Sequence, residues 1–317
     1  MGTRIRQRLP IRQWLPLWRR DGLLKGILYI VATPIGNVGD ITDRAKRILS
    51  EVDIIAAEDT RTTQILLGIL GIKNKTISNH KFNEKHQVDF LISQLETGKC
   101  VAIVSDAGTP CISDPGGIIV KAAAERGITI EGVCGASSVI TALSVCGFYF
   151  DTFVFYGFLP RETSEIMKAI RTARKSNAGV SVFFESPRRV KKSMEIFADE
   201  APDAALCLCN DLTKMYERIY RGTASEVLNE LRNNPAAEKG EYTLVAELGE
   251  VLADTADNDI AYEALLVDHI IKNGGSMKDA VNALAQTYKG SITKKDFYTA
   301  SLNLRTIFRE TISQIST

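Results

Sequence analysis

Short apolar runs alternate with helical segments from Ile27 onward, and this alternation limits the possible folds more than any other feature of the 317 residues. A continuous apolar run such as residues 101–104 is typical of a strand that is buried on both faces of a parallel sheet. Each run is followed by a segment with apolar residues at helical spacing. Five such strands before residue 147 therefore predict a mostly parallel, doubly wound α/β sheet.

A second α/β unit follows a turn at residues 147–152, where a helix of small residues gives way to the aromatic run Phe153–Tyr156. Its expected strands cover residues 153–156, 180–184, 205–209 and 242–248, with helices near 162–175, 187–199 and 224–233. Beyond residue 250 the pattern becomes helical. The predicted organisation is a basic extension at 1–26 that we expect to be disordered, α/β domains at 27–148 and 149–250, and a small helical module at 251–317.

The charge is unevenly distributed along the chain. Residues 1–26 hold seven of the 39 Arg and Lys residues but only one of the 38 Asp and Glu residues, so the remainder carries a net charge of −5. A nucleic-acid ligand would then need a local basic patch. The extension is expected to be a floppy tail, with an organelle-targeting peptide or an RNA-contacting arm as alternatives.

Several common functional classes find no support in the composition. The six cysteines form no CxxC pair and are expected to be small core residues in a reducing compartment, and with three histidines no metal site is expected. No apolar run is long enough to cross a bilayer. The motifs of Rossmann dinucleotide sites, P-loops, HExxH metalloproteases and nucleophile elbows are missing.

The segment from Val104 to Gly116 is the strongest candidate for a ligand-binding loop. It joins a buried strand to a helix through small residues, and in open α/β sheets ligands collect beyond the carboxyl ends of the strands. Asp114 before Pro115 predicts the cap of the following helix, as Thr60 does for the helix after the second strand. Comparable loops lie at residues 33–37, 58–61, 135–138, 184–188 and 211–214, and we expect them to meet at a cleft between the two units.

Six motifs in these loops, in the same order, resemble the ribosomal RNA small subunit methyltransferase I family. That family belongs to the tetrapyrrole methylase-like (class III) S-adenosylmethionine-dependent methyltransferases, which have two α/β domains. The resemblance covers residues 28–248, and the C-terminal helices are similar to the helix-turn-helix-like module of that family. The motifs are TPIGN at 33–37, AEDTR at 57–61, SDAGTPCISDPG at 105–116, GFLP at 157–160, FESPR at 184–188 and LTK at 212–214.

The resemblance implies S-adenosylmethionine-dependent transfer of a methyl group to the ribose 2′-hydroxyl of a cytidine in the decoding region (P site) of 16S rRNA. It also implies a cytoplasmic enzyme that acts on the 30S subunit, forms a homodimer and has no membrane segment. Asp106 is expected to accept hydrogen bonds from the cofactor or, alternatively, to cap its own turn. The residues implied in cofactor binding are Pro34, Ser105, Asp106, Ala107, Gly108, Thr109, Ser137, Ser138 and Leu212.

A ribose hydroxyl is a weak nucleophile and benefits from a positioned base or an electrostatic partner. We assign catalytic roles to Glu58, Arg61, Glu185 and Lys214, while Asp59 and His80 remain alternatives for the base. Arg61 and Lys214 could instead bind phosphate, Glu185 could be the ion-pair partner of Arg188 or Arg189, and His80 could be a capping group. The residues expected to contact RNA are Arg161, Arg171, Arg174, Lys175, Arg188, Arg189, Lys191 and Lys192.

Two positions depart from the family pattern. Gly-Ala-Ser stands at 135–137 where the relatives usually have Gly-Pro-Ser, and Asn210-Asp211 replaces the usual Arg-Glu, so any contact made there by the arginine is in doubt. Two other functions remain open. One is a methyltransferase of the same fold that acts on a small molecule such as a tetrapyrrole, and the other is an RNA-binding ribosome-assembly factor without catalysis.

Overall fold

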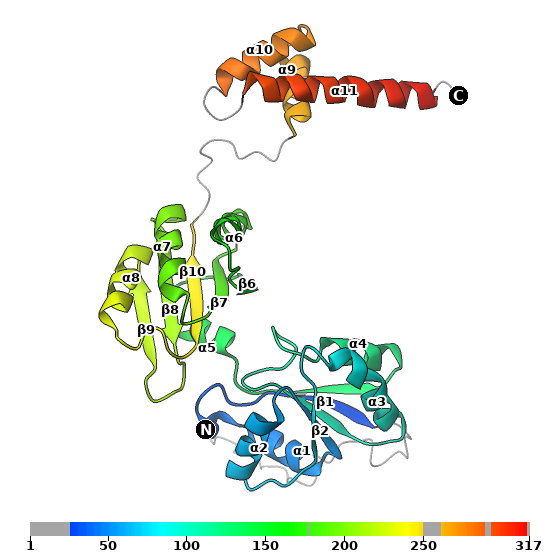
Figure 1. Ribbon diagram of the computed structural model, residues 1–317, viewed down its shortest axis with the longest axis vertical. Coiled ribbons are helices and arrows are strands. Elements are labelled where there is room, and N and C mark those ends of the chain that lie inside the picture. Colours follow the sequence, from blue (N-terminus) through cyan, green and yellow to red (C-terminus); the bar gives the residue numbers. More distant parts are fainter. Residues whose placement is uncertain (1–25, 177, 250–260, 289–292, 316–317) are drawn as a thin grey trace, which may run out of the picture. The chain divides into compact units, whose positions relative to one another are not determined.

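The structure is a computed structural model that describes residues 26–176, 178–249, 261–288 and 293–315. The predicted basic extension lies outside the described residues, apart from Gly26. The described chain forms two compact units, divided near residue 251. The first unit contains two five-stranded sheets and the second contains three helices (Figure 1).

The first sheet confirms the predicted parallel, doubly wound arrangement. Its strand order is β3-β2-β4-β1-β5, and every paired strand is parallel to its neighbour. The strands are β1 (Ile27–Val31), β2 (Ile54–Ala57), β3 (Thr76–Ser78), β4 (Val101–Val104) and β5 (Thr129–Val133), and the helices are η3 (Val38–Asp40), α1 (Asp43–Glu51), α2 (Thr60–Ile69), α3 (Glu84–Glu96) and α4 (Gly117–Glu125).

Helices cover both faces of the first sheet because successive strand residues point to opposite sides. Ile27, Tyr29 and Val31 pack in one core with α1 and α2, while Leu28 packs in another with α3 and α4. Figure 1 shows the two helix pairs on either side of the strands. All strand carboxyl ends therefore lie at one edge of this sheet.

The second sheet is mixed, with the order β6-β7-β10-β8-β9. β6 and β7 are parallel, whereas β10 runs antiparallel to both β7 and β8. The sequence analysis missed β9, whose single buried side chain, Tyr220, leaves no continuous apolar run. The elements are β6 (Phe153–Phe158), α6 (Thr163–Lys175), β7 (Val180–Glu185), α7 (Val190–Glu200), β8 (Ala205–Asn210), β9 (Arg218–Gly222), α8 (Ala224–Asn233) and β10 (Tyr242–Glu247).

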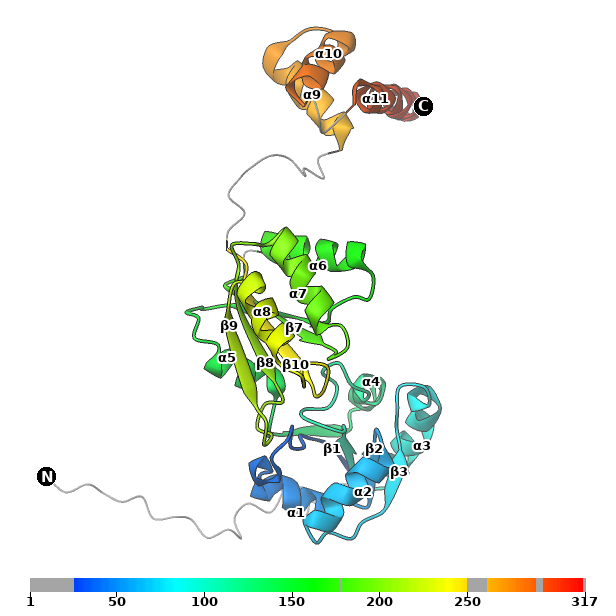
Figure 2. The ribbon, with the colours of Figure 1, turned by 60° about the vertical axis from the view of Figure 1, so that its left-hand side comes forward.

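Helix α5 (Ser138–Val145) links the two halves of the first unit. It follows the last strand of the first sheet, yet Val139, Ala142 and Leu143 pack with Val182 and Val245 of the second sheet. Helices α6, α7 and α8 cover the other face, as Figure 2 shows. The two sheets are thus joined by a shared apolar core as well as by the chain.

Two predicted helix caps are wrong. Asp59, not Thr60, is the N-cap of α2, and its carboxylate accepts a hydrogen bond from the Arg61 amide. Asp114 does not cap α4, which begins after Gly116. The buried carboxylate of Glu84 on α3 instead accepts hydrogen bonds from the amides of Gly116 (2.9 Å) and Ile118 (3.0 Å). A distant side chain therefore replaces the local cap.

The second unit confirms the predicted C-terminal helical module. It consists of α9 (Tyr262–Asn273), α10 (Met277–Thr287) and α11 (Lys294–Ile315), packed around Leu266, Leu284 and Phe297. Ser276 and Asp279 form a capping box at the start of α10. None of the helices in the described ranges has the length and apolarity to cross a membrane.

Candidate active site

The predicted loops meet at a single pocket within the first unit. Loops of the first sheet reach those of the second most closely at Gly36, where a Cβ atom would lie 2.5 Å from the Lys214 Cγ and 2.9 Å from the Leu212 carbonyl oxygen. The Asn37 amide also donates a hydrogen bond of 3.1 Å to the Thr213 hydroxyl. Only glycine permits this close approach of the two loops.

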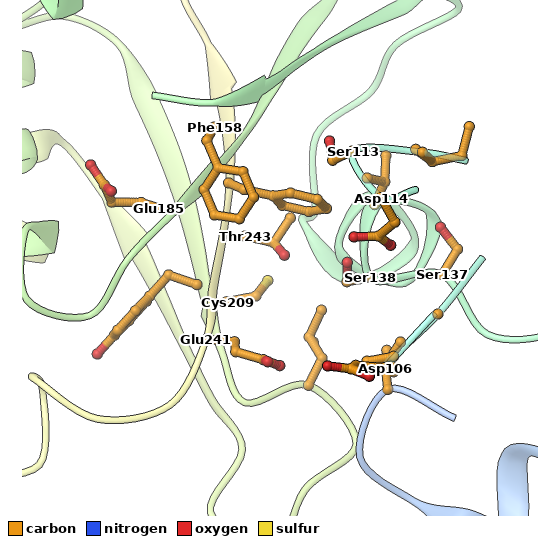
Figure 3. A pocket seen from close by; sticks show the side chains of 18 of the residues that line it. Asp106, Ser113, Asp114, Ser137, Ser138, Phe158, Glu185, Cys209, Glu241 and Thr243 are labelled. Carbon is orange, nitrogen blue, oxygen red and sulfur yellow. The ribbon is translucent and has the colours of Figure 1, made fainter. Parts of the chain in front are cut away.

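The pocket encloses about 370 Å³ and is lined by both sheets (Figure 3). From the first half come Ile35, Glu58, Asp106, Ala107, Gly108, Thr109, Ile112, Ser113, Asp114, Ser137, Ser138 and Val139; from the second come Phe158, Phe184, Glu185, Ser186, Pro187, Cys209, Leu212, Gly240, Glu241, Tyr242 and Thr243. Of the residues expected to bind the cofactor, all but Pro34 and Ser105 are among them. A cavity of this size is typical of small-molecule sites.

Two acidic loops brace each other at the floor of the pocket. The Glu58 carboxylate accepts a hydrogen bond from the Asp106 amide (3.4 Å), and the Asp106 carboxylate accepts one from the Asp59 amide (3.1 Å). Glu58 follows β2 and Asp106 follows β4, which are neighbouring parallel strands. Their carboxyl ends therefore place both acids at the same edge of the sheet.

Several polar groups of the 105–109 loop already form hydrogen bonds within the protein. Gly108 and Thr33 exchange two backbone hydrogen bonds of 2.9 and 3.1 Å, while the buried Ser105 hydroxyl bonds to the Ala107 carbonyl oxygen. The Thr109 hydroxyl donates to the Ala136 carbonyl oxygen (3.2 Å). These contacts fix the loop, so that the amide of Gly108 is not free to bind a ligand.

The amino end of α5 faces the pocket. Ser137 is its N-cap and accepts a hydrogen bond from the Ile140 amide, and both Ser137 and Ser138 line the cavity. The unpaired amides at a helix N-terminus favour negatively charged groups. This is the one part of the first-half wall that suits an anionic group of a ligand.

The pocket carboxyl groups have raised pKa values. Burial is the largest cause for Glu58, Asp106 and Asp114, and the negative charges of neighbouring acids add to it. For Asp114, burial together with Glu58 and Asp106 raises the pKa to about 6. Figure 3 shows Asp106 and Asp114 on the same side of the pocket. These acids form a concentrated negative region whose carboxylates are stabilised by hydrogen bonds from the amides of Asp106 and Asp59 and from the Ser105 hydroxyl.

No Lys, Arg or His occurs among the pocket-lining residues, all of which belong to the described part of the chain. An acidic wall without a cation favours a ligand that brings positive charge itself. Apolar side chains such as Ile35, Val139 and Leu212 complete the lining. The acidic and apolar lining therefore suits a positively charged ligand of moderate size that also has apolar parts.

Sequence reasoning missed the wall formed by Gly240, Glu241, Tyr242 and Thr243. These residues lie at the start of β10, and the rule that ligands gather at the carboxyl ends of parallel strands does not include a strand's first residues. Because β10 runs antiparallel to β7 and β8, its amino end lies beside their carboxyl ends. Gly240-Glu241 directly before the strand at 242–247 was the signal in the sequence.

Glu185 lines the pocket, but its carboxylate is fully buried in another interaction. It forms an ion pair of 2.6 Å with Arg189 and accepts hydrogen bonds from Ser193 and from the Ser186 amide. Figure 3 shows Glu185 on the far side of the Phe158 ring from Asp106. The structure thus brings Glu185 to the wall without directing its charge into the cavity.

Arg61 and Lys214 lie outside the pocket lining. The Arg61 guanidinium, on a largely exposed side chain, pairs with Asp59 at 3.1 Å. Lys214 pairs with Asp211 (2.8 Å) and with Glu241 (3.0 Å), which lowers the positive charge that it presents to the pocket. Of the four residues predicted to be catalytic, Glu58 alone directs an acidic side chain to the pocket floor.

His80 is a capping group, which was one of the alternatives predicted from the sequence. Its Nδ1 accepts hydrogen bonds of 3.2 Å from the amides of Phe82 and Asn83, at the start of α3. The structure therefore favours a helix-capping role for His80 over that of a general base.

The basic cluster that was expected to contact RNA divides into two groups. Arg171 pairs with Glu200, Arg174 with Asp203, Arg189 with Glu185 and Lys191 with Glu238. Arg161, Arg188 and Lys192 are exposed and have no side-chain partner among the described residues. Much of the cluster is thus already neutralised within the protein.

The substituted positions 210 and 211 serve to hold β10. The Asn210 amide donates to the Glu241 carbonyl oxygen (3.3 Å), and the Asp211 carboxylate accepts from the Glu241 amide (3.2 Å). Both side chains therefore position the missed wall of the pocket.

Comparisons with known proteins identify the relatives of this chain. Residues 27–228 match the family model described as Tetrapyrrole (Corrin/Porphyrin) Methylases. The chain is 39% identical over 279 residues to ribosomal RNA small subunit methyltransferase I of Halalkalibacterium halodurans, covering 86% of this chain and 94% of that protein. It is 37% identical over 279 residues to the protein of the same name from Bacillus subtilis, covering 87% and 94%.

Solved structures show the same fold at low sequence identity. A diphthine synthase crystal structure superposes with a TM-score of 0.53 at 15% identity, covering 69% of this chain and 89% of the synthase. At this identity the likeness extends to the fold alone.

Proposed function

The chain belongs to the ribosomal RNA small subunit methyltransferase I family of tetrapyrrole methylases, and on that premise we propose that it methylates the ribose 2′-hydroxyl of a P-site cytidine in 16S rRNA, with S-adenosylmethionine as donor. The observation that carries the proposal is the pocket between the two sheets, which has an acidic floor and no cationic lining residue. A sulfonium cofactor brings the positive charge that this pocket lacks.

The lining residues fit the parts of such a cofactor. Asp106 and Asp114 would hold its positive end, while Ser137 and Ser138 at the start of α5 would take its carboxylate. The apolar side chains of Ile35, Val139 and Leu212 would cover its neutral atoms. When bound, S-adenosylmethionine supplies an electrophilic methyl group on a sulfonium sulfur.

The contribution of the protein is to orient the acceptor and to remove a proton. Holding donor and acceptor in line removes much of the entropic barrier to methyl transfer. We assign Glu58 as the proton acceptor for the ribose hydroxyl, because its carboxylate faces the pocket and its raised pKa makes it a stronger base when ionised. The Glu58 carboxylate would take the proton of the ribose hydroxyl while the hydroxyl oxygen accepts the methyl group that the cofactor would supply, with the neutral thioether of the cofactor as the leaving group.

The other predicted catalytic residues take supporting parts in this proposal. Arg61 is exposed beside the acidic floor, where it can contact an RNA phosphate. Lys214 holds Glu241 at the pocket wall. Glu185 positions Arg189. Pro34 and Ser105, which do not line the cavity, act through the loops of their neighbours Ile35 and Asp106.

The proposed substrate implies the cytoplasm as the site of action and small ribosomal subunits as partners. We also propose a homodimer. Ile65 and Ile69 lie one helical turn apart on α2 and are 65% and 62% exposed, and Phe82 is 90% exposed. Apolar surface of this kind is typical of protein interfaces. Light scattering after gel filtration tests this, and a monomeric mass would contradict it.

The test of function uses 30S subunits from cells that lack the protein. Purified enzyme and S-[methyl-³H]adenosylmethionine should label 16S rRNA, and nuclease digestion with mass spectrometry should identify 2′-O-methylcytidine. Transfer only to tetrapyrroles would favour the small-molecule alternative. Absence of S-adenosylmethionine binding in calorimetry, with rRNA binding retained, would favour a non-catalytic assembly factor.

A further inference from the structure

An irregularity in β6 determines how one aromatic side chain meets the pocket. The pairing of β6 with β7 shifts register between Phe155 and Phe158, and Gly157 has a φ of 74°. In a regular strand, residues three apart point to opposite faces. Here Phe155 and Phe158 both pack on Phe184, at ring-centroid distances of 4.8 and 5.3 Å. The bulge has therefore turned Phe158 to the pocket side.

Phe158 remains accessible in that position. Phe158 is 58% exposed although it lines the cavity, and its ring meets the Phe184 ring in an edge-to-face arrangement. Figure 3 shows the ring at the pocket. An exposed phenyl ring at the opening of a site is suited to stacking on a nucleobase.

Two loops at this rim are fastened to each other by a buried ion pair. Arg189, held by Glu185, donates hydrogen bonds to the carbonyl oxygens of Pro160 (2.7 Å) and Leu159 (3.2 Å). The segment after β6 is thereby tied to the segment after β7. The residue that follows Pro160 and the one that precedes Arg189 are both arginines.

Arg161 and Arg188, like Lys192, differ in their surroundings from the paired cations of this region. Both are exposed, and neither has a side-chain partner within the described ranges, whereas Arg171, Arg174 and Lys191 are paired with acids. Pro187, directly before Arg188, lines the pocket, as does Phe158, three residues before Arg161. The rim thus presents uncompensated guanidinium groups beside an acidic cavity.

We propose that Phe158, Arg161 and Arg188 form the RNA-binding rim of the pocket. Phe158 stacks on the base of the nucleotide that is methylated or on its neighbour. Arg161 and Arg188 bind backbone phosphates on either side, and Arg189 with Glu185 keeps the two arginine-bearing loops at a fixed spacing. The inference rests on the proposed function, since it takes the substrate of the pocket to be RNA.

The experiment compares the double variant Arg161→Ala/Arg188→Ala with the wild type in methylation of 30S subunits. We expect KM for 30S to rise by roughly tenfold or more, with kcat and the calorimetric Kd for S-adenosylmethionine unchanged. The slope of log binding constant against log salt concentration should fall by about two, because each lost phosphate contact lowers it by about one.

The matched control is Lys73→Ala/Lys75→Ala. These two exposed lysines precede β3 and so lie at the edge of the first sheet opposite the pocket. The control removes the same charge and should retain the wild-type KM and salt slope. Equal changes in the two double variants would show a general charge effect and would overturn the assignment of a rim.

The variant Phe158→Leu tests stacking, since it keeps apolar volume and removes the ring. We expect affinity for 30S to fall by roughly 5- to 150-fold, the range for loss of one stacked base, with cofactor affinity retained. Weaker binding of S-adenosylmethionine instead would assign the ring to the cofactor. A wild type that fails to methylate 30S refutes the proposed function, whereas an active wild type that matches both rim variants refutes this inference alone.

Discussion

The floor and the rim of the pocket differ in charge, in origin and in the way they are held. The floor consists of Glu58 and Asp106, which follow neighbouring parallel strands and are braced by backbone hydrogen bonds, together with Asp114 further along the 105–116 loop. The rim carries unpaired arginines on loops that a buried ion pair fastens together. Opposite charges within one small site can serve two ligands of opposite charge, so each region should respond to mutation without the other.

The largest effect is expected from a substitution of Glu58, the proposed base in the pocket floor. Glu58→Gln keeps the shape of the side chain and an oxygen acceptor for the Asp106 amide, but it cannot take a proton. The value of kcat should fall by about 10²- to 10⁴-fold, measured by single-turnover methylation of 30S subunits. Affinity for 30S should not change. Glu51→Gln, an exposed acid at the end of α1, is the control, and full activity of Glu58→Gln would exclude Glu58 as the base.

A second variant removes the ion pair between Arg189 and Glu185 that supports the rim. Arg189→Ala leaves the Glu185 carboxylate buried without its partner, which should lower the free energy of unfolding by about 3–5 kcal/mol in urea titrations. Adding Glu185→Gln should recover part of this loss, because the uncompensated charge is removed. A single variant as stable as the wild type would show that the pair does not hold the two loops.

A third variant tests whether the bulge in β6 positions Phe158 at the rim. Gly157→Ala places a side chain at a φ of 74°, which should destabilise the fold by about 1–2 kcal/mol and raise KM for 30S as Phe158 shifts. Gly117→Ala on α4, where a Cβ meets no atom within 4 Å, is the matched control and should not destabilise. Equal unfolding midpoints for the two variants would contradict the account of the bulge.

The smallest expected effect is on the pH dependence of stability, through the charge of Asp114 in the pocket floor. Because the pKa of Asp114 is raised to about 6, the folded state binds a proton more tightly than the unfolded state, and stability should fall as pH rises from about 4 to 6. A two-unit shift corresponds to about 3 kcal/mol, but solvent screening of this half-buried group leaves roughly 1 kcal/mol. Thermal unfolding of Asp114→Asn should show a smaller fall over this range, and an identical pH profile would contradict the prediction.

The strand and helix pattern made the first sheet predictable, because strands buried on both faces have continuous apolar runs. β9 was not predictable in this way, since a sheet-edge strand with one buried side chain has no such run. The predicted cap of α4 was wrong for another reason. Its acceptor, Glu84, lies on a different helix, and local propensity carries no information on contacts between distant residues.

The candidate site was predictable only where it follows the carboxyl ends of strands. Most residues expected to bind the cofactor do line the pocket, because parallel strands bring their final residues to one edge. Arg61 and Lys214 are polar residues in the expected loops, yet both are engaged by acids. The sequence shows which groups are present but not which pairs form, and the charge that a site presents depends on those pairs.

The central position of β10 in the second sheet has a consequence for how the protein is made. As the chain is synthesised, β6 to β9 emerge before β10, but the pairs β6-β7 and β8-β9 have no hydrogen-bonded connection until β10 enters between them. The same strand supplies one wall of the pocket. A nascent chain that ends before residue 242 therefore lacks one wall of the pocket, and the pocket can be completed only after the last strand of the sheet has been translated.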